Sequence, residues 1–208
     1  MTRGVGTMCR HRAVVALVAM LALAGCVTQE TRRDAVEEIN RAFRAEYETV
    51  LSKRGTRVIA APQAEVFDAT RAMLVRLGMT VRQQSPGLGL LTADAPAPRP
   101  LSREEWARAS VADLPKAREL LAKHVGALAN LFTFEPEGLN IVINANVLET
   151  PGGTEVAFAM RMREVDAPKS GMPRREYPPP TAVTIGIDKL WDELDRELRS
   201  RSTTGPRR

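Results

Sequence analysis

The stretch that decides the fold is residues 139–165, LNIVINANVLETPGGTEVAFAMRMREV. Apolar and polar side chains alternate through 139–148 and again through 154–165. A period of two is typical of strands that bury one face. Because Pro151-Gly152-Gly153 between the two runs is a turn sequence, the stretch predicts a β-hairpin with one buried face.

The asparagines of the first strand, Asn140, Asn144 and Asn146, lie on its other face. Two interpretations are open. The amides bind a sugar or a peptide, or they form the solvent face opposite Ile141 and Ile143.

A second hairpin is predicted upstream, preceded by a strand and a helix. Proline is tolerated in a first helical turn and glycine is a common helix stop, so Pro62 and Gly78 bound the helix. The turn sequence Ser85-Pro86-Gly87 joins the two strands. The predicted elements are a strand at 57–61, a helix at 62–77, and strands at 79–84 and 88–93.

An insert at 101–132 separates the hairpins, after a proline-rich loop at 94–100. Ser102-Arg103-Glu104-Glu105 is a capping-box sequence that opens a helix. Pro115 is expected to end this helix, and a second helix then runs to about Leu131. Trp106 is a candidate contact for a membrane or a partner, with packing inside the insert as the alternative.

The domain ends with a basic, proline-rich loop at 167–180 and a helix at 181–200, and the tail 201–208 is expected to be disordered. The loop carries Arg174 and Arg175. It is a candidate surface for anionic headgroups or an acidic partner, and the alternative is a plain connector.

An amphipathic helix is predicted at 34–52, after a flexible tether at 27–33. Apolar residues spaced by three and four, from Val36 to Leu51, share one face, and Lys53-Arg54-Gly55 is a typical stop. The helix either packs on its own domain or presents a coiled-coil-like seam to a partner.

These elements predict an α+β domain at 57–200, with an antiparallel sheet of about four or five strands and helices on one face. A long C-terminal helix across the sheet would make it helix-grip-like. The runs 64–67, 77–81 and 89–93, AEVF, LGMTV and GLLTA, resemble small helix-grip envelope lipoproteins, such as the C lipoprotein component of the outer-membrane β-barrel assembly machinery. The insert 101–132 departs from that family, so no partner or functional residue is transferred.

Residues 1–25 have the pattern of a secretory signal peptide: a basic start, an uncharged apolar run at 13–24, and small residues before a cut. The run is shorter than the roughly 20 residues that span a bilayer as a helix. Leu23-Ala24-Gly25-Cys26 resembles the lipobox of bacterial lipoproteins. The alternative is an ordinary signal peptide that leaves Cys26 free.

The lipobox resemblance implies that cleavage leaves Cys26 at the N-terminus of a segment 26–56, with a diacylglyceryl group on its sulfur and usually an acyl group on its amine. Several chains together hold a protein firmly on a membrane. Val27 follows, not the aspartate that favours inner-membrane retention in Gram-negative sorting. The resemblance therefore implies an outer-membrane anchor facing the periplasm.

The composition of the chain excludes several classes of function. Removing residues 1–25, which hold three arginines and no acid, lowers the net charge from +5 to about +2, and nucleic acid binding needs a concentrated basic face. The remaining chain keeps one cysteine, Cys26, and one histidine, His124. We therefore expect no disulfide, no conventional zinc site and no cofactor.

Without a nucleophile motif or a His-based constellation, no catalytic residue is predicted. We expect a non-enzymatic binding, scaffold or assembly factor that is tethered to the membrane through Cys26 and has an envelope protein as its partner. The alternative is a periplasmic ligand-binding or carboxylate-dependent hydrolytic domain that uses the sheet face.

Overall fold

The predicted hairpin of residues 139–165 forms the centre of the sheet. In the computed structural model, which describes residues 28–166 and 174–203, strands β4 (Leu139–Thr150) and β5 (Gly153–Glu164) pair antiparallel over their whole length. Ile143 lies opposite Met160, and Ala145 lies opposite Phe158. All four side chains are buried, as the alternation predicts.

The other strands complete a five-stranded antiparallel sheet of order β1-β5-β4-β3-β2. They are β1 (Thr56–Ile59), β2 (Thr80–Ser85) and β3 (Leu90–Pro96). Strand β3 continues past the predicted 88–93 into the expected loop, because Ala95 and Pro96 pair with β4. Pro96 fits there because β2 begins at Thr80, opposite Asp94, and does not extend alongside Pro96, so no neighbour on that side needs its missing N–H.

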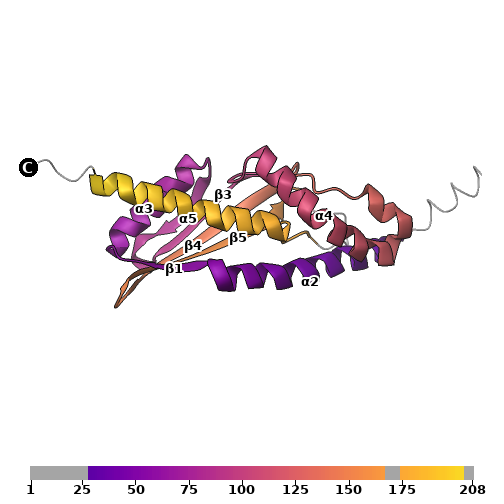
Figure 1. Cartoon of the computed structure of the whole chain (residues 1–208), viewed down its shortest axis with the longest axis horizontal. Helices are drawn as coiled ribbons and strands as arrows, with labels where there is room; N and C mark the ends of the chain where they lie inside the picture. The colour runs from indigo at the N-terminus through magenta and orange to yellow at the C-terminus, as the bar shows by residue number, and fades with distance from the viewer. Residues whose placement is uncertain (1–27, 167–173, 204–208) are drawn as a thin grey trace, which may run out of the picture.

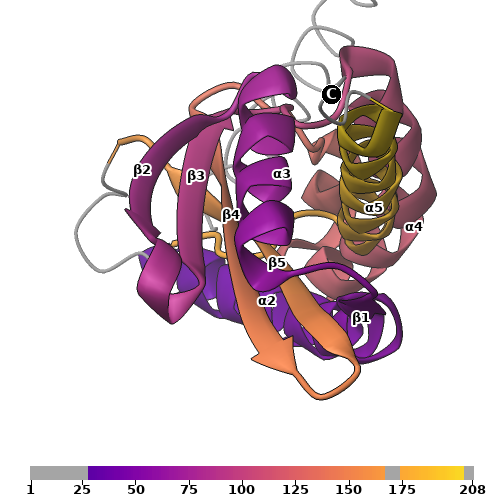
Figure 2. The ribbon, with the colours of Figure 1, turned by 90° about the vertical axis from the view of Figure 1, so that its left-hand side faces the viewer.

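Helices α3 (Gln63–Arg76) and α5 (Pro180–Thr203) pack against one another and cover one face of the sheet (Figure 2). Trp191 of α5 is fully buried, with its ring centroid 4.6 Å from that of Phe158. Its Nε1 donates a hydrogen bond of 2.7 Å to the carbonyl oxygen of Arg54. The structure confirms an α+β fold with an antiparallel sheet and helices on one face.

The N-terminal helix α2 (Gln29–Arg54) begins five residues before the predicted start at Asp34. Thr28 caps it, since its side-chain oxygen accepts a hydrogen bond from the N–H of Thr31 at 3.1 Å. The predicted tether at 27–33 is therefore wrong from residue 29 onward. The predicted stop at Gly55 is confirmed.

Helix α2 packs on its own domain, which was the first of the two interpretations. Its buried side chains are spaced by four residues, and they belong to the same apolar core as the sheet and α5: Ala35, Ile39, Phe43 and Tyr47. Figure 1 shows α2 running from beside β1 to the end of the molecule that lies beyond the sheet.

The insert is one helix, α4 (Arg103–Val125), followed by the 3-10 helix η2 (Gly126–Leu131). The predicted capping box at Ser102 and Glu105 is confirmed, but the predicted break at Pro115 is wrong. The helix continues through the proline, and tertiary contacts lie on both sides of it. Asp113 accepts hydrogen bonds from Thr181, and Lys116 pairs with Glu46.

Helix α5 runs to Thr203, so residues 201–203 of the predicted disordered tail are helical. The predicted signal peptide at residues 1–25, Cys26 and residues 167–173 of the basic loop lie outside the described residues. Within the described ranges, no helix has the length and apolar character needed to cross a bilayer.

Candidate functional site

The candidate site is an apolar cavity of about 280 Å³ between the N-terminal half of α2 and helix α4. It lies in the half of the molecule beyond the sheet and is called the α2–α4 cavity below. Its lining comes from α2, α4, the segment after η2, the ends of β4 and β5, and the segment before α5: Arg32, Ala35, Val36, Ile39, Asn40, Phe43, Trp106, Leu121, Val125, Phe132, Phe134, Glu135, Leu139, Met162, Arg175, Tyr177 and Pro179.

Charged side chains hold α2 against α4 outside the cavity. The Glu38 carboxylate lies 2.5 Å from His124 Nε2 and 3.1 Å from Lys123 Nζ. The hydrogen bond from His124, and then that from Lys123, lowers the pKa of Glu38 below its ordinary value. A second ion pair, between Glu46 and Lys116, joins the same two helices further along.

One wall of the cavity is the extended segment that follows η2, and α4 holds it through its backbone carbonyls. Trp106 Nε1 donates to the carbonyl oxygen of Phe134 at 2.9 Å, and the Arg118 guanidinium donates to that of Phe132 at 3.1 Å. The rings of Phe132 and Phe134 meet edge to face at 4.9 Å, and Phe134 lies 5.7 Å from Phe43 of α2. Aromatic rings therefore face the cavity from two sides.

The opposite wall is the segment that leads into α5. The Asn40 side chain donates to the carbonyl oxygen of Arg174 at 2.7 Å, and Tyr177 packs edge to face on Tyr47 at 5.2 Å. The N–H of Met162 in β5 donates to the carbonyl oxygen of Glu176. This segment therefore also pairs with the free edge of β5, which protects that edge from other chains.

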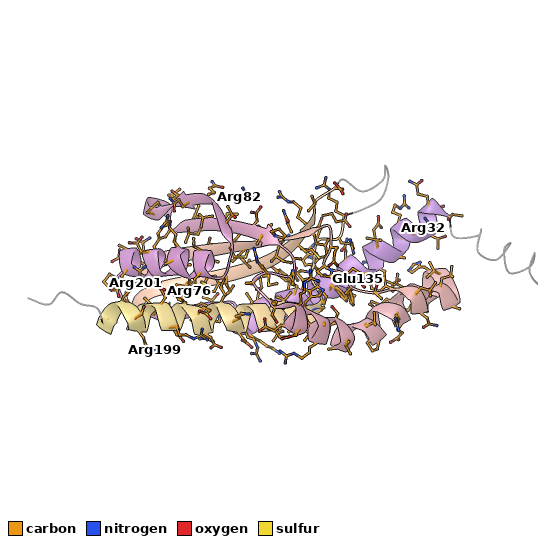
Figure 3. All side chains as sticks on the ribbon, turned by 90° about the horizontal axis from the view of Figure 1, so that it is seen from above. Arg32, Arg76, Arg82, Glu135, Arg199 and Arg201 are labelled. Carbon is orange, nitrogen blue, oxygen red and sulfur yellow. The ribbon has the colours of Figure 1, made fainter. Side chains whose placement is uncertain are left out.

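The polar groups of the lining belong to Arg32, Asn40, Glu135, Arg175 and Tyr177. Arg32 and Glu135 are exposed, and both lie in the half of the molecule opposite Arg199 and Arg201 (Figure 3). Two positively charged and one negatively charged side chain leave little net charge at the cavity. This arrangement accepts an apolar group whose polar end stays outside.

Exposed leucines lie on the 3-10 helix next to the cavity. Leu131 is 78% exposed and Leu128 is 42% exposed. They follow α4 directly, at the end where Val125 lines the cavity and His124 contacts α2. Figure 1 shows α4 ending where α2 begins, so the exposed leucines, the cavity and the start of α2 share one end of the molecule.

The chemistry available in the cavity suits binding. Its lining includes one carboxylate, Glu135, and contains no histidine, cysteine, serine or lysine. Within residues 28–166 and 174–203, no cluster of three or more His, Cys, Asp or Glu side chains could hold a metal ion. Burying alkyl groups is the one interaction that nearly every lining residue offers.

Three of the predicted contact residues lie at or near this cavity. Trp106 lines it and is only 3% exposed, which agrees with packing inside the insert and not with an exposed contact. Arg175 lines it and pairs with Glu164 at 2.7 Å. Arg174 is exposed nearby, with its carbonyl bound by Asn40.

The predicted asparagines lie elsewhere, on the uncovered face of the sheet. Asn144 and Asn146 are exposed, and Asn144 Oδ1 accepts a hydrogen bond from Thr92 Oγ1 at 2.9 Å. One carboxylate on this face, Asp94, is paired with Arg82 at 2.6 Å and with Arg163 at 3.5 Å. The asparagines thus lie on the exposed face of the sheet and do not line the α2–α4 cavity.

The sequence analysis missed the walls of the cavity. Phe132 and Phe134 fall in a segment without periodicity, and Ala35 was not counted with the apolar face of its helix. One signal was available: of the five phenylalanines in the chain, two stand one residue apart in a segment that is neither a predicted helix nor a predicted strand. Such rings need an apolar partner.

Comparisons with protein-family models, with curated proteins and with solved structures found no match to the chain.

Proposed function

We propose that this protein is an envelope lipoprotein, anchored through Cys26 and facing the periplasm, that acts without catalysis by binding an alkyl chain in the α2–α4 cavity. The observation that carries the proposal is the cavity itself: about 280 Å³, lined almost entirely by carbon, at the end where α2 begins. Such a site suits an accessory factor whose partner is an envelope protein that handles lipid or is itself modified with lipid.

The size of the cavity suits one alkyl chain. A methylene group fills roughly the volume of a water molecule, about 30 Å³, so 280 Å³ holds about nine methylene groups. Burying them contributes about 7 kcal/mol, at ~0.8 kcal/mol each. Since association has its own entropic cost, this sets the tightest Kd for a simple chain at about 10 µM.

The position of the cavity supports a membrane role. Cys26 stands two residues before Thr28, the N-cap of α2, and the first turns of α2 line the cavity. Lipid on Cys26 would hold this end of the molecule at the membrane surface. The exposed Leu128 and Leu131 then face the interface, where apolar side chains are stabilised.

A binding assay tests the proposal. The chain from residue 26 with Cys26→Ser contains every residue of the described core and cannot be acylated there. We expect it to bind the apolar dye N-phenylnaphthylamine at one saturable site, and dodecanoate to displace the dye.

Two matched variants locate the site. Val36 lines the cavity and is partly exposed, whereas Ala45 is exposed on the same helix and does not line it. Val36→Trp is expected to remove binding, and Ala45→Trp to leave it unchanged. Absence of saturable dye binding, or binding untouched by Val36→Trp, would overturn the proposal. Mass spectrometry of the N-terminus of the processed protein tests the anchor, and an unmodified Cys26 would refute it.

A further inference from the structure

We propose that one acyl chain carried by Cys26 occupies the α2–α4 cavity of its own molecule until the protein meets a membrane. This inference rests on the proposed function, and it names the resident occupant of the cavity and how the cavity becomes free. The cavity then has two states: it is filled by the resident chain before membrane insertion, and it is free to bind another alkyl chain afterwards.

The distance between the lipid and the cavity fits an acyl chain. Cys26 precedes Thr28 by two residues, and the cavity lining begins at Arg32 and continues through Val36. At a rise of 1.5 Å per residue, Val36 lies about 12 Å along α2 from Thr28. An acyl chain spans one leaflet of the hydrocarbon core, about 15 Å. A chain attached at Cys26 can therefore lie along the first turns of α2 and fill the cavity.

The small net charge around the cavity fits an attached chain that carries no charge of its own. Arg32 and Arg175 are balanced in part by Glu135, and Arg175 is already paired with Glu164. A free carboxylate would meet Glu135 as well as the arginines. Ester-linked and amide-linked chains bring no charge, so they need no counter-ion in the lining.

Occupation by the resident chain would couple membrane attachment to ligand binding in the cavity. A single inserted chain holds a protein only marginally, and each further chain strengthens the anchor. When a bilayer takes up the sequestered chain, the anchor becomes firmer and the cavity opens to the alkyl chain of another molecule. By linkage, a ligand that fills the cavity would strengthen membrane attachment by the same factor.

Photocrosslinking of the acylated protein tests this inference. A diazirine-bearing fatty acid is incorporated biosynthetically into the lipid on Cys26, and the purified acylated chain is irradiated after detergent removal and again in phosphatidylglycerol-containing vesicles. In buffer we expect crosslinks from the lipid to peptides that contain Trp106, Leu121 or Phe134, since these side chains line the cavity. In vesicles we expect these crosslinks to fall at least tenfold as lipid adducts replace them.

The same pair of variants serves as control. Val36→Trp should remove the intramolecular crosslinks in buffer, and Ala45→Trp should keep them. Crosslinks confined to residual detergent or to other protein copies would overturn the inference. If the Cys26→Ser chain still binds the dye while the acylated chain shows no crosslink to the cavity, the resident occupant is refuted and the proposed function stands. If the Cys26→Ser chain binds no dye, both fail.

Discussion

Filling the α2–α4 cavity from within should stabilise the protein and weaken ligand binding at the same time. Ala35 of α2 lines the cavity and is 3% exposed. Ala35→Leu adds three carbon atoms at this position. Leucine and alanine have similar helix propensities, so the change acts through the cavity and not through the helix.

The magnitude follows from the lining. Three buried carbons contribute about 2.4 kcal/mol at ~0.8 kcal/mol each. Ordering a leucine side chain costs about 0.5–1 kcal/mol. The free energy of unfolding of the unacylated chain should therefore rise by about 1.5 kcal/mol. A ligand that loses room for three methylene groups loses about 2.4 kcal/mol, which is roughly a fiftyfold weaker Kd.

Urea unfolding of the Cys26→Ser chain measures the first effect, and displacement of N-phenylnaphthylamine by dodecanoate measures the second. Ala45→Leu is the control, because Ala45 is exposed on the same helix, and its stability should stay within about 0.5 kcal/mol of the parent. A variant Ala35→Leu that loses more than about 1 kcal/mol of stability while binding dodecanoate normally would show that the position is already fully packed.

Three further changes test the contacts around the cavity. Hydrogen bonds from His124 and Lys123 lower the pKa of Glu38, so the stabilisation that Glu38 contributes is present above its ordinary pKa and is lost as the pH falls through the lowered pKa. The urea midpoints of wild type and Glu38→Gln should therefore differ near pH 7 and converge in acid. A difference that does not change with pH would contradict this. Burial raises the pKa of Asp113, so the neutral variant Asp113→Asn should lower the free energy of unfolding only slightly. Asp113→Ala removes both hydrogen bonds to the start of α5 and should lower it by about 1 kcal/mol. Equal losses in the two variants would refute the capping role. Trp106→Phe leaves the carbonyl of Phe134 without its donor and should cost about 1–3 kcal/mol in urea unfolding and weaken dye binding; unchanged dye binding would show that this wall does not contact the ligand.

The sequence predicted the sheet because its strands alternate with a period of two and because turn residues separate them. It also predicted the end of α2, since Lys53-Arg54-Gly55 is a local stop signal. The start of α2 was predicted too late, because Thr28 caps the helix and the residues after it are mostly charged and lack an apolar pattern. The break predicted at Pro115 is absent, and tertiary contacts lie on both sides of this residue.

The cavity could not be predicted from periodicity. Its walls come from segments about a hundred residues apart, joined by contacts such as Phe43 on Phe134 and Asn40 on the carbonyl of Arg174. Nothing in the local pattern of residues 132–134 indicates which helix they face. The position of the segment follows from two hydrogen bonds that α4 donates to its carbonyl oxygens, and a sequence does not show such pairings.

The cavity is also difficult to explain as a packing defect. Three of the five phenylalanines in the chain, Phe43, Phe132 and Phe134, line it, and the other two belong to the core around the sheet. The cavity opens to the surface, so its apolar lining meets water when nothing fills it. Rings that could have closed the space are instead held at its walls by hydrogen bonds and ring contacts. An alkyl occupant covers this apolar lining, and the lipid expected on Cys26, two residues before the N-cap of α2, is the nearest source of one.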